Sequence, residues 1–279
     1  MKQLLVDSIG RIDLIVWVLV IVFFCGSSLI FSGNIQLAFM GAAGIIVEML
    51  IIGVSIEIII DSLKQHKGIG TITGFITNGP EALCLIVGLV VGDILFAAST
   101  PLGSNFMNPV LLFAAALICG TVISVLKCKP FYTITTIVAT AAFALGFYIL
   151  DVSLYFWWVI GAILVTIPLF IIRPTEQNNP SGEETSQSAN WLIPAVILLI
   201  GAGYFLDPVV SFAAENSKAP KGVIGFFILA TLTSWPEFKS CLALLNRGKT
   251  LAAILNITVS NITNIWLAAA GIGFYILTV

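Results

Sequence analysis

Two glutamates stand inside long apolar stretches, and each directly follows a proline. Glu81 ends the segment TNGPE (residues 77–81), and Glu237 ends TSWPE (residues 233–237). A carboxylate at mid-membrane depth is costly unless it is protonated, paired or bound to a cation. The proline removes a backbone N–H and interrupts the helix, so nearby carbonyl oxygens can also bind a cation. The chemistry these residues predict is cation binding inside a membrane.

The two glutamates belong to a longer repeat with a constant offset of 156 residues. A second polar motif follows each of them, GSNFMN at 103–108 and VSNITN at 259–264. Ser and Asn four residues apart share one face of a helix, so each motif offers two polar side chains together. The paired positions are Thr77 with Thr233, Pro80 with Pro236, Ser104 with Ser260, Asn105 with Asn261, and Asn108 with Asn264.

Around the two glutamates, hydroxyl and amide oxygens complete a candidate ligand set. Its neutral members are Thr77, Asn78, Ser104, Asn108, Thr233, Ser234, Ser260 and Asn264. Two carboxylates with neutral oxygens suit a hard cation such as Ca²⁺, or several Na⁺ ions. Ser, Thr and Asn in membrane helices also often do no more than hydrogen-bond a neighbouring helix. For each neutral residue taken singly, that alternative stays open.

The composition excludes several classes of protein. Of 279 residues, 59% are apolar and 9% are charged, whereas a soluble domain carries about 25% charged residues. The net charge of −2 comes without a basic cluster, which argues against a nucleic-acid partner. His66 is the single histidine, and neither a nucleotide loop nor a nucleophile–base pair is present. We therefore expect no enzyme and no cofactor; the partners are cation substrates and the lipid bilayer.

An all-α, polytopic membrane protein of about nine helices is the predicted fold. The apolar stretches lie near 12–32, 35–62, 69–97, 103–126, 131–150, 153–172, 191–213, 221–246 and 250–277. Asp7 and Asp13 are not typical of a signal peptide, so the first stretch is interpreted as a retained helix. Most cations fall on one side of this arrangement, which places the N-terminus inside and the C-terminus outside.

The spans divide the chain into unequal parts. Residues 1–34 form an additional N-terminal helix, 35–173 hold the first repeat (about 70–126), 174–190 are an acidic cytoplasmic linker, and 191–279 hold the second repeat (about 221–277). An odd number of helices separates the repeats, so their Pro-Glu helices run in opposite directions. This is the inverted-topology arrangement of many secondary transporters, whose ion site lies near the midplane.

At these motifs the sequence resembles the cation/Ca²⁺ exchanger superfamily, which includes sodium/calcium and proton/calcium exchangers. TSWPE and GSNFMN fit the family's two motifs closely, and TNGPE is partway to the form of the proton-coupled branch. The resemblance implies that the two glutamates are the central ligands shared by Ca²⁺ and a counter-ion, Na⁺ or H⁺, and that the eight neutral residues match oxygen-ligand positions. It further implies alternating access, with the long helices near 40–62 and 191–213 sliding over a fixed core.

The sequence departs from the family pattern in three ways. The family typically has ten helices, two of them after the second repeat; those two are lacking here, and the helix at 12–32 is additional. Asn264 stands where many members carry Asp, which removes a negative charge from the site. Lys239 lies two residues past Glu237, and we expect it to point away from the site and to extend toward the cytoplasmic interface.

The leading hypothesis is an antiporter that exchanges Ca²⁺ or a related cation against Na⁺ or H⁺ in the plasma (inner) membrane. One alternative is a transporter of another cation or of a small solute. Another is a non-transporting, degenerate exchanger-like membrane protein, which the missing helices and Lys239 favour. A further acid, Glu57, is expected to face either the ion path or the first helix.

Overall fold

The computed structural model describes residues 8–92, 94–176, 189–219 and 231–278, and these form helices without any strand. The helices are α2 (Arg11–Ile30), α3 (Ile35–Ser62), α4 (Ile69–Ile76), α5 (Gly79–Val91), α6 (Ile94–Ile118), α7 (Val122–Lys127), α8 (Pro130–Ile149), α9 (Tyr155–Ile171), α10 (Leu192–Ser217), α12 (Trp235–Asn246) and α13 (Thr250–Thr278). Short 3₁₀ turns precede α9 and α10. Eight helical segments in this part of the chain are long and apolar enough to span a membrane. The predicted all-α, polytopic fold is confirmed.

The helix boundaries differ from the predicted spans in three places. The predicted span 69–97 is two helices, α4 and α5, and it ends at Val91 because Gly92 adopts φ 91°. The predicted span 103–126 begins earlier, at Ile94, and ends at Ile118, where a turn through Gly120 at φ 66° leads into the short α7. Glycine accepts this left-handed conformation without strain. Of the predicted span 221–246, residues 221–230 lie outside the described residues, 231–233 are helical, and α12 follows.

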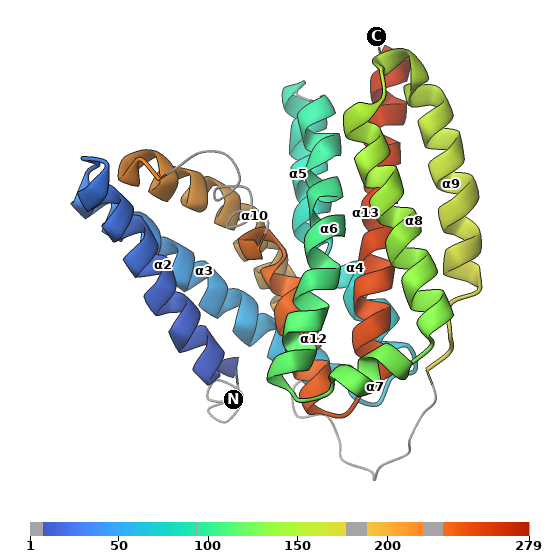
Figure 1. Cartoon of the computed structure of the whole chain (residues 1–279), viewed down its shortest axis with the longest axis horizontal. Helices are drawn as coiled ribbons and strands as arrows, with labels where there is room; N and C mark the ends of the chain where they lie inside the picture. Colours follow the sequence, from blue (N-terminus) through green and yellow to red (C-terminus); the bar gives the residue numbers. More distant parts are fainter. Residues whose placement is uncertain (1–7, 93, 177–188, 220–230, 279) are drawn as a thin grey trace.

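Three helices form an oblique group beside the main bundle (Figure 1). Within it α3 and α10 pack antiparallel along nearly their whole length. They approach so closely that a Cβ added at Gly41 would lie 2.6 Å from the Ala213 Cβ. At one end the Asn34 N–H donates to the Asn216 carbonyl over 2.8 Å. The third member, α2, packs against both.

The main bundle surrounds α13, the most buried long helix (Figure 1). This helix contacts α4, α5, α6, α8, α9 and α12. The closest approach is to α4, where a Cβ at Gly70 would lie 2.2 Å from the Ala252 carbonyl oxygen, and a Cβ at Gly74 would lie 2.7 Å from that of Asn256. Small residues let the two backbones pack directly, as in other membrane helices.

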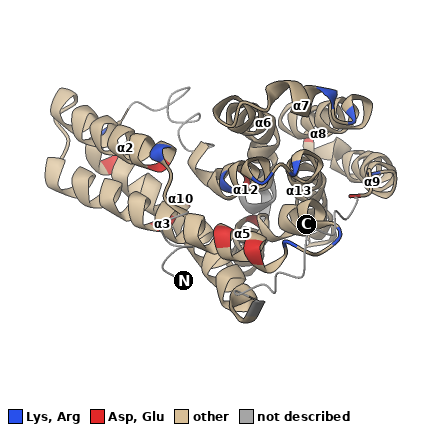
Figure 2. Ribbon diagram, turned by 90° about the horizontal axis from the view of Figure 1, so that it is seen from below, with Lys and Arg blue, Asp and Glu red and all other residues tan. Residues whose placement is uncertain are grey.

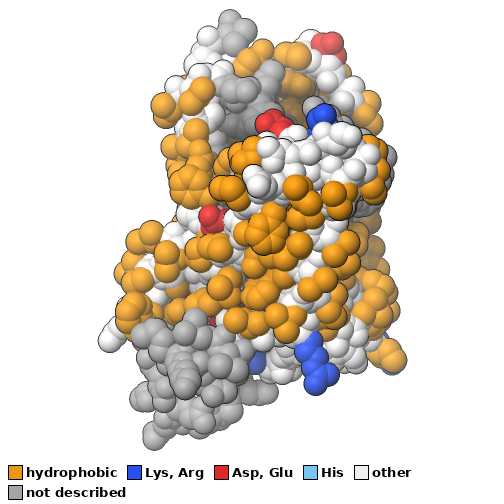
Figure 3. Space-filling model, turned by 90° about the vertical axis from the view of Figure 1, so that its left-hand side faces the viewer, with side chains coloured by type: hydrophobic (Ala, Val, Ile, Leu, Met, Phe, Trp, Pro, Cys, Tyr) orange, Lys and Arg blue, Asp and Glu red, His pale blue; other side chains and the backbone are white. Residues whose placement is uncertain are grey.

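The outer surface is predominantly apolar. Figure 3 shows hydrophobic side chains over much of one face, with few charges among them. Val90, Phe131 and Leu277 are 82%, 81% and 86% exposed, on three different helices. Exposed apolar side chains of this number suit a lipid environment and not water. The chain is an integral, multi-pass membrane protein.

One end of the bundle gathers loops that carry cations. The Lys249 ammonium donates to the Lys64 carbonyl over 2.6 Å, which joins the loop before α13 to the loop after α3. Figure 2, which views this end, shows Lys and Arg around α2, α7, α12 and α13. α2 begins near the same end, whereas α13 ends at the opposite one (Figure 1).

The linker predicted at 174–190 starts in contact with this end of the bundle. The N–H groups of Gly70 and Thr71 donate to Glu176 Oε1 over 3.0 and 3.4 Å. Glu176 therefore binds the first turn of α4. Residues 177–188 lie outside the described part of the chain.

Candidate cation site

Both Pro-Glu motifs lie at the start of a helix, directly after a break. α4 ends at Ile76 and α5 begins at Gly79, so Pro80 and Glu81 are the second and third residues of α5. In the second half α12 begins at Trp235, followed by Pro236 and Glu237. Proline is favoured in a first turn because the N–H it lacks would have no helical partner there. The positive end of each helix dipole therefore lies at a glutamate and favours its charged form.

The structure brings the predicted ligands into the protein interior. The nine fully buried members are Thr77, Asn78, Glu81, Ser104, Asn108, Ser234, Glu237, Ser260 and Asn264; Thr233 is half-buried. The Ser260 hydroxyl contacts both Asn78, three residues before Glu81, and the Glu237 carboxylate, so the two glutamates come from neighbouring helix starts. Two buried carboxylates near each other repel when both are charged, and a bound cation relieves that repulsion.

Ser260 joins the two helix breaks. Its hydroxyl lies 2.8 Å from Asn78 Oδ1 and 3.3 Å from Glu237 Oε1, and Asn78 Nδ2 donates to the Ser260 carbonyl over 2.8 Å. A hydroxyl has one proton, so it satisfies only one of these two acceptors at a time. The break before α5 and the carboxylate of α12 thus share one hydroxyl on α13.

Asn108 extends this network from α6. Its Nδ2 donates to Ser260 Oγ over 3.1 Å and to Asn261 Oδ1 over 2.9 Å. The amide nitrogen is therefore turned toward α13, which leaves the amide oxygen for another partner.

Six oxygens of the predicted ligands are buried without a hydrogen-bond partner among the described residues. They are Thr77 Oγ1, Glu81 Oε2, Asn108 Oδ1, Ser234 Oγ, Glu237 Oε2 and Asn264 Oδ1. Buried polar atoms are almost always paired, so such a concentration calls for an explanation. The described residues hold no group of three or more His, Cys, Asp or Glu suited to a metal. The available donors are two carboxylates and neutral oxygens, which fit a hard cation.

Asn105 and Asn261 are the residues that the ligand prediction missed. Each amide nitrogen donates to the main-chain carbonyl of the other over 3.3 Å. Asn261 Nδ2 also lies 3.3 Å from Thr140 Oγ1 on α8, and Asn264 Nδ2 donates to Asn105 Oδ1 over 3.2 Å. The repeat offset contained the signal, since it pairs these two asparagines, but it assigned them no role.

The long helices of the oblique group pack directly on the two breaks. A Cβ at Gly203 of α10 would lie 2.3 Å from Pro80 Cγ, and a Cβ at Gly79 would lie 2.3 Å from Ile200 Cγ1. Likewise α3, from the first half of the chain, packs along α12, from the second half. Each helix that starts with Pro-Glu therefore packs against the long helix of the opposite half.

The charges nearest the site differ from expectation. Lys239 does not extend to the membrane interface: its ammonium lies 2.8 Å from Asp13 Oδ2 on α2, and it is buried. Glu57 faces neither α2 nor the candidate ligands, because it pairs with Arg247 at the end of α12. Both pairings join residues more than 180 positions apart, which the sequence pattern does not reveal.

Residues 189–278 match the family model described as sodium/calcium exchanger protein. The match covers 90 of the 279 residues and contains Glu237, Ser260 and Asn264. It confirms the resemblance at TSWPE, whereas TNGPE and GSNFMN lie outside the matched segment. The matched family is one of transporters. Glu81 and its neighbours precede the matched segment, although in space they face it. No curated protein and no solved structure matches the chain.

Proposed function

We propose that the protein is a secondary antiporter that exchanges Ca²⁺, or a related cation, against Na⁺ or H⁺. The observation that carries this proposal is a pair of buried carboxylates, each in the first turn of a helix, that contribute two of the six unpartnered oxygens, the other four coming from neutral side chains. The family match at residues 189–278 supports it from the sequence side. In this proposal Glu81 and Glu237 hold the cation together with Thr77, Asn78, Ser104, Asn108, Thr233, Ser234, Ser260 and Asn264.

Charge balance supports one divalent cation or two monovalent ones in this site. The two carboxylates supply two negative charges, and Asn264 contributes none. In a low-dielectric interior the net charge of a loaded site must stay close to zero, because a surplus charge is poorly solvated there. The condition is met if one Ca²⁺ occupies the site during transport in one direction and two Na⁺ or two H⁺ occupy it during transport in the other.

The transport mechanism in this proposal is alternating access between two inverted repeats. α5 and α12 run from the breaks toward opposite ends of the bundle (Figure 1), and each packs on the long helix of the other half. An inverted repeat gives two similar routes to one site, and the sliding of α3 and α10 over the breaks opens them in turn. The end rich in Lys and Arg is cytoplasmic by the positive-inside rule, in the plasma (inner) membrane.

The test is a flux assay with the purified full-length chain in lipid vesicles. An outward Na⁺ or H⁺ gradient should drive uptake of radioactive Ca²⁺. Glu81→Gln and Glu237→Gln should each abolish uptake, since glutamine keeps the shape of the side chain and removes its charge. Glu48→Gln on α3 is the matched control and should retain uptake. Normal flux in either site variant would refute the proposed site, and Ca²⁺ binding without any flux would indicate a non-transporting cation-binding protein.

A further inference from the structure

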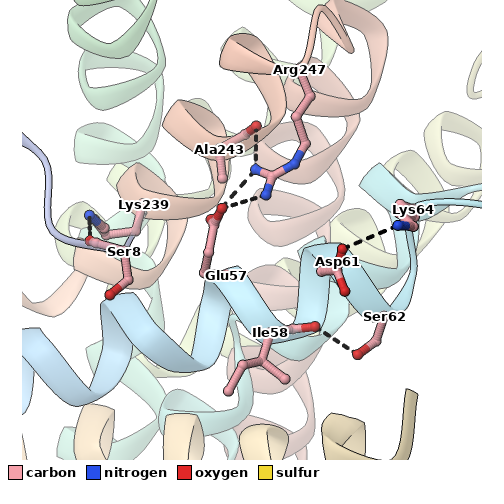
Figure 4. A network of polar contacts seen from close by, with 9 residues as sticks. All are labelled: Ser8, Glu57, Ile58, Asp61, Ser62, Lys64, Lys239, Ala243 and Arg247. Atoms are coloured by element: carbon pink, nitrogen blue, oxygen red, sulfur yellow. Dashed lines mark hydrogen bonds and ion pairs between the residues drawn. The ribbon is translucent and has the colours of Figure 1, made fainter. Parts of the chain in front are cut away.

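α12 carries two cations on one face, between the candidate site and the end of the helix. Lys239, Ala243 and Arg247 follow at four-residue intervals, which places them on one side of α12. That side packs against α3, where Gly53 and Glu57 are also four residues apart. Each cation is paired with an acid from a different helix. Figure 4 shows the pair of Glu57 with Arg247 and the contact of Lys239 with Ser8.

The first pair fastens α12 to α2. Lys239 Nζ lies 2.9 and 2.8 Å from the two Asp13 carboxylate oxygens and donates to the Ser8 carbonyl over 2.9 Å. The side chain passes Gly53 of α3, where a Cβ would lie 3.3 Å from Lys239 Cε. The side chains of Lys239 and Asp13 are only 10% and 6% exposed. Because all three ammonium protons have acceptors, the pair is complete as well as buried.

The second pair fastens α12 to α3. Both guanidinium NH₂ groups of Arg247 contact the Glu57 carboxylate, and Nη1 also donates to the Ala243 carbonyl over 3.0 Å (Figure 4). This fork-to-fork geometry is the most directional ion pair that side chains form. The Arg247 side chain is 31% exposed, so this pair closes the outer part of the α3–α12 contact.

Together the two pairs occupy the line of contact between α12 and the α2–α3 helices. This line begins two residues after Glu237 and ends where the loops with Lys64 and Lys249 meet. Apolar side chains alone would hold such a contact without a defined register. Paired charges favour one register, and the Glu57–Arg247 pair, whose Arg247 side chain is 31% exposed, lies at the end of α12 that water can reach.

We propose that the Asp13–Lys239 and Glu57–Arg247 pairs form a latch that closes the approach to the cation site along the α3–α12 contact. Opening of the latch exposes the site to the side where Arg247 lies. Asp13 and Glu57 are positioning residues in this scheme, since they act on α12 and not on the ion. The proposal rests on the proposed function, and it assigns half of the latch to α2, the helix additional to the family pattern.

The first test measures access and needs no transport. Ala243→Cys places a thiol on the α12 face between the two cations, and its labelling by a membrane-impermeant maleimide is compared with the parent chain. The double variant Glu57→Gln/Arg247→Gln removes the pair without leaving a lone charge. It should raise the labelling rate about tenfold. We expect this because loss of the pair should shift the equilibrium between the closed and the open α3–α12 contact about tenfold toward the open form. Exchange of the charges, Glu57→Arg/Arg247→Glu, should restore slow labelling.

Asp61→Asn is the matched control, because the Asp61–Lys64 pair at 3.5 Å joins residues only three positions apart in the chain (Figure 4). It should leave labelling unchanged. Thermal unfolding of each purified variant, with and without CaCl₂, verifies folding and reports Ca²⁺ binding. Should the neutral double variant be unfolded, Asp13→Asn/Lys239→Met takes its place at the other pair. Slow labelling in a folded neutral variant would overturn the latch.

The second test separates a latch from a merely structural ion pair. In vesicles the neutral double variant should bind Ca²⁺ with an unchanged Kd but show a maximal exchange rate altered about fivefold or more, a change in barrier and not in affinity. If the melting temperature falls while the exchange rate and the labelling rate stay unchanged, the ion pairs only stabilise the fold, and the latch is refuted. If the parent chain binds Ca²⁺ without exchange, the proposed function fails, and the labelling result still decides the latch.

Discussion

Asn105 and Asn261 each donate an amide proton to the main-chain carbonyl of the other, over 3.3 Å in both directions. The two residues are 156 positions apart, the offset that also relates Glu81 to Glu237. The reciprocal contact joins α6 and α13 at equivalent positions of the sequence repeat. Four of the predicted ligands lie beside it on these two helices, Ser104 and Asn108 on α6 and Ser260 and Asn264 on α13.

We expect Asn261→Leu to destabilise the protein more than Asn105→Leu. The Asn261 side chain donates to Asn105 and to Thr140 and accepts from Asn108, whereas the Asn105 side chain makes two hydrogen bonds. Each buried partner left without a hydrogen bond costs about 1–3 kcal/mol. Melting temperatures of the purified variants measure the difference. Asn216→Leu at the end of α10 is the control, and equal losses in all three variants would contradict the argument.

Gly70→Ala should prevent close packing of α4 on α13. The added Cβ would lie 2.2 Å from the Ala252 carbonyl oxygen and 2.6 Å from its Cα, which are main-chain atoms that cannot move aside. We expect a loss of about 3 kcal/mol or more, or failure to fold. In Gly273→Ala nothing lies within 4 Å of the new Cβ, so stability should rise by roughly 0.5–1 kcal/mol. Chemical denaturation in detergent compares the two; similar stabilities would refute the close approach.

Glu176 should make stability depend on pH at the loop-rich end. Burial raises the pKa of its carboxyl, while the Thr71 and Gly70 N–H groups and Lys249 act in the opposite direction. Because the folded-state pKa lies above the unfolded value, the folded chain binds the proton more tightly. The stability from this group is therefore present below the unfolded pKa and is lost as pH rises through the folded one.

Glu176→Gln tests this sign. The variant keeps an oxygen that can accept from Gly70 and Thr71 but does not titrate, so its melting temperature should fall less than that of the parent chain as pH rises from 4 to 7. An unchanged pH profile would show that Glu176 does not contribute.

Asn264→Asp should strengthen the binding of divalent cations. It adds a third carboxylate where Asn264 Oδ1 is buried without a partner among the described residues. We expect the Kd for Ca²⁺ to fall about tenfold, which corresponds to ~1.4 kcal/mol, with a smaller change for Na⁺. Ca²⁺-dependent thermal shifts report the Kd, and Asn216→Asp adds the same charge outside the site as a control. A weaker affinity in Asn264→Asp would contradict the assignment of residue 264 as a ligand position.

The sequence by itself predicts the class of fold and the helix breaks. Apolar runs long enough to cross a bilayer require helices, because backbone polar groups have no other partners in lipid. Pro80 and Pro236 predict a helix break before each glutamate. The reason is local, because proline lacks the backbone N–H that would continue a preceding helix. The offset of 156 residues predicts which polar side chains are equivalent, and the structure buries nine of the ten predicted ligands together.

Only the tertiary structure decides which charges meet. Nothing in the local sequence around Lys239 or Asp13 relates these two residues, which are 226 positions apart. Their pairing depends on how α2 lies across α3 and on the absent side chain of Gly53. The same holds for Glu57 and Arg247. Helix periodicity assigns a residue to a face, but the direction in which packed helices cross determines what that face contacts.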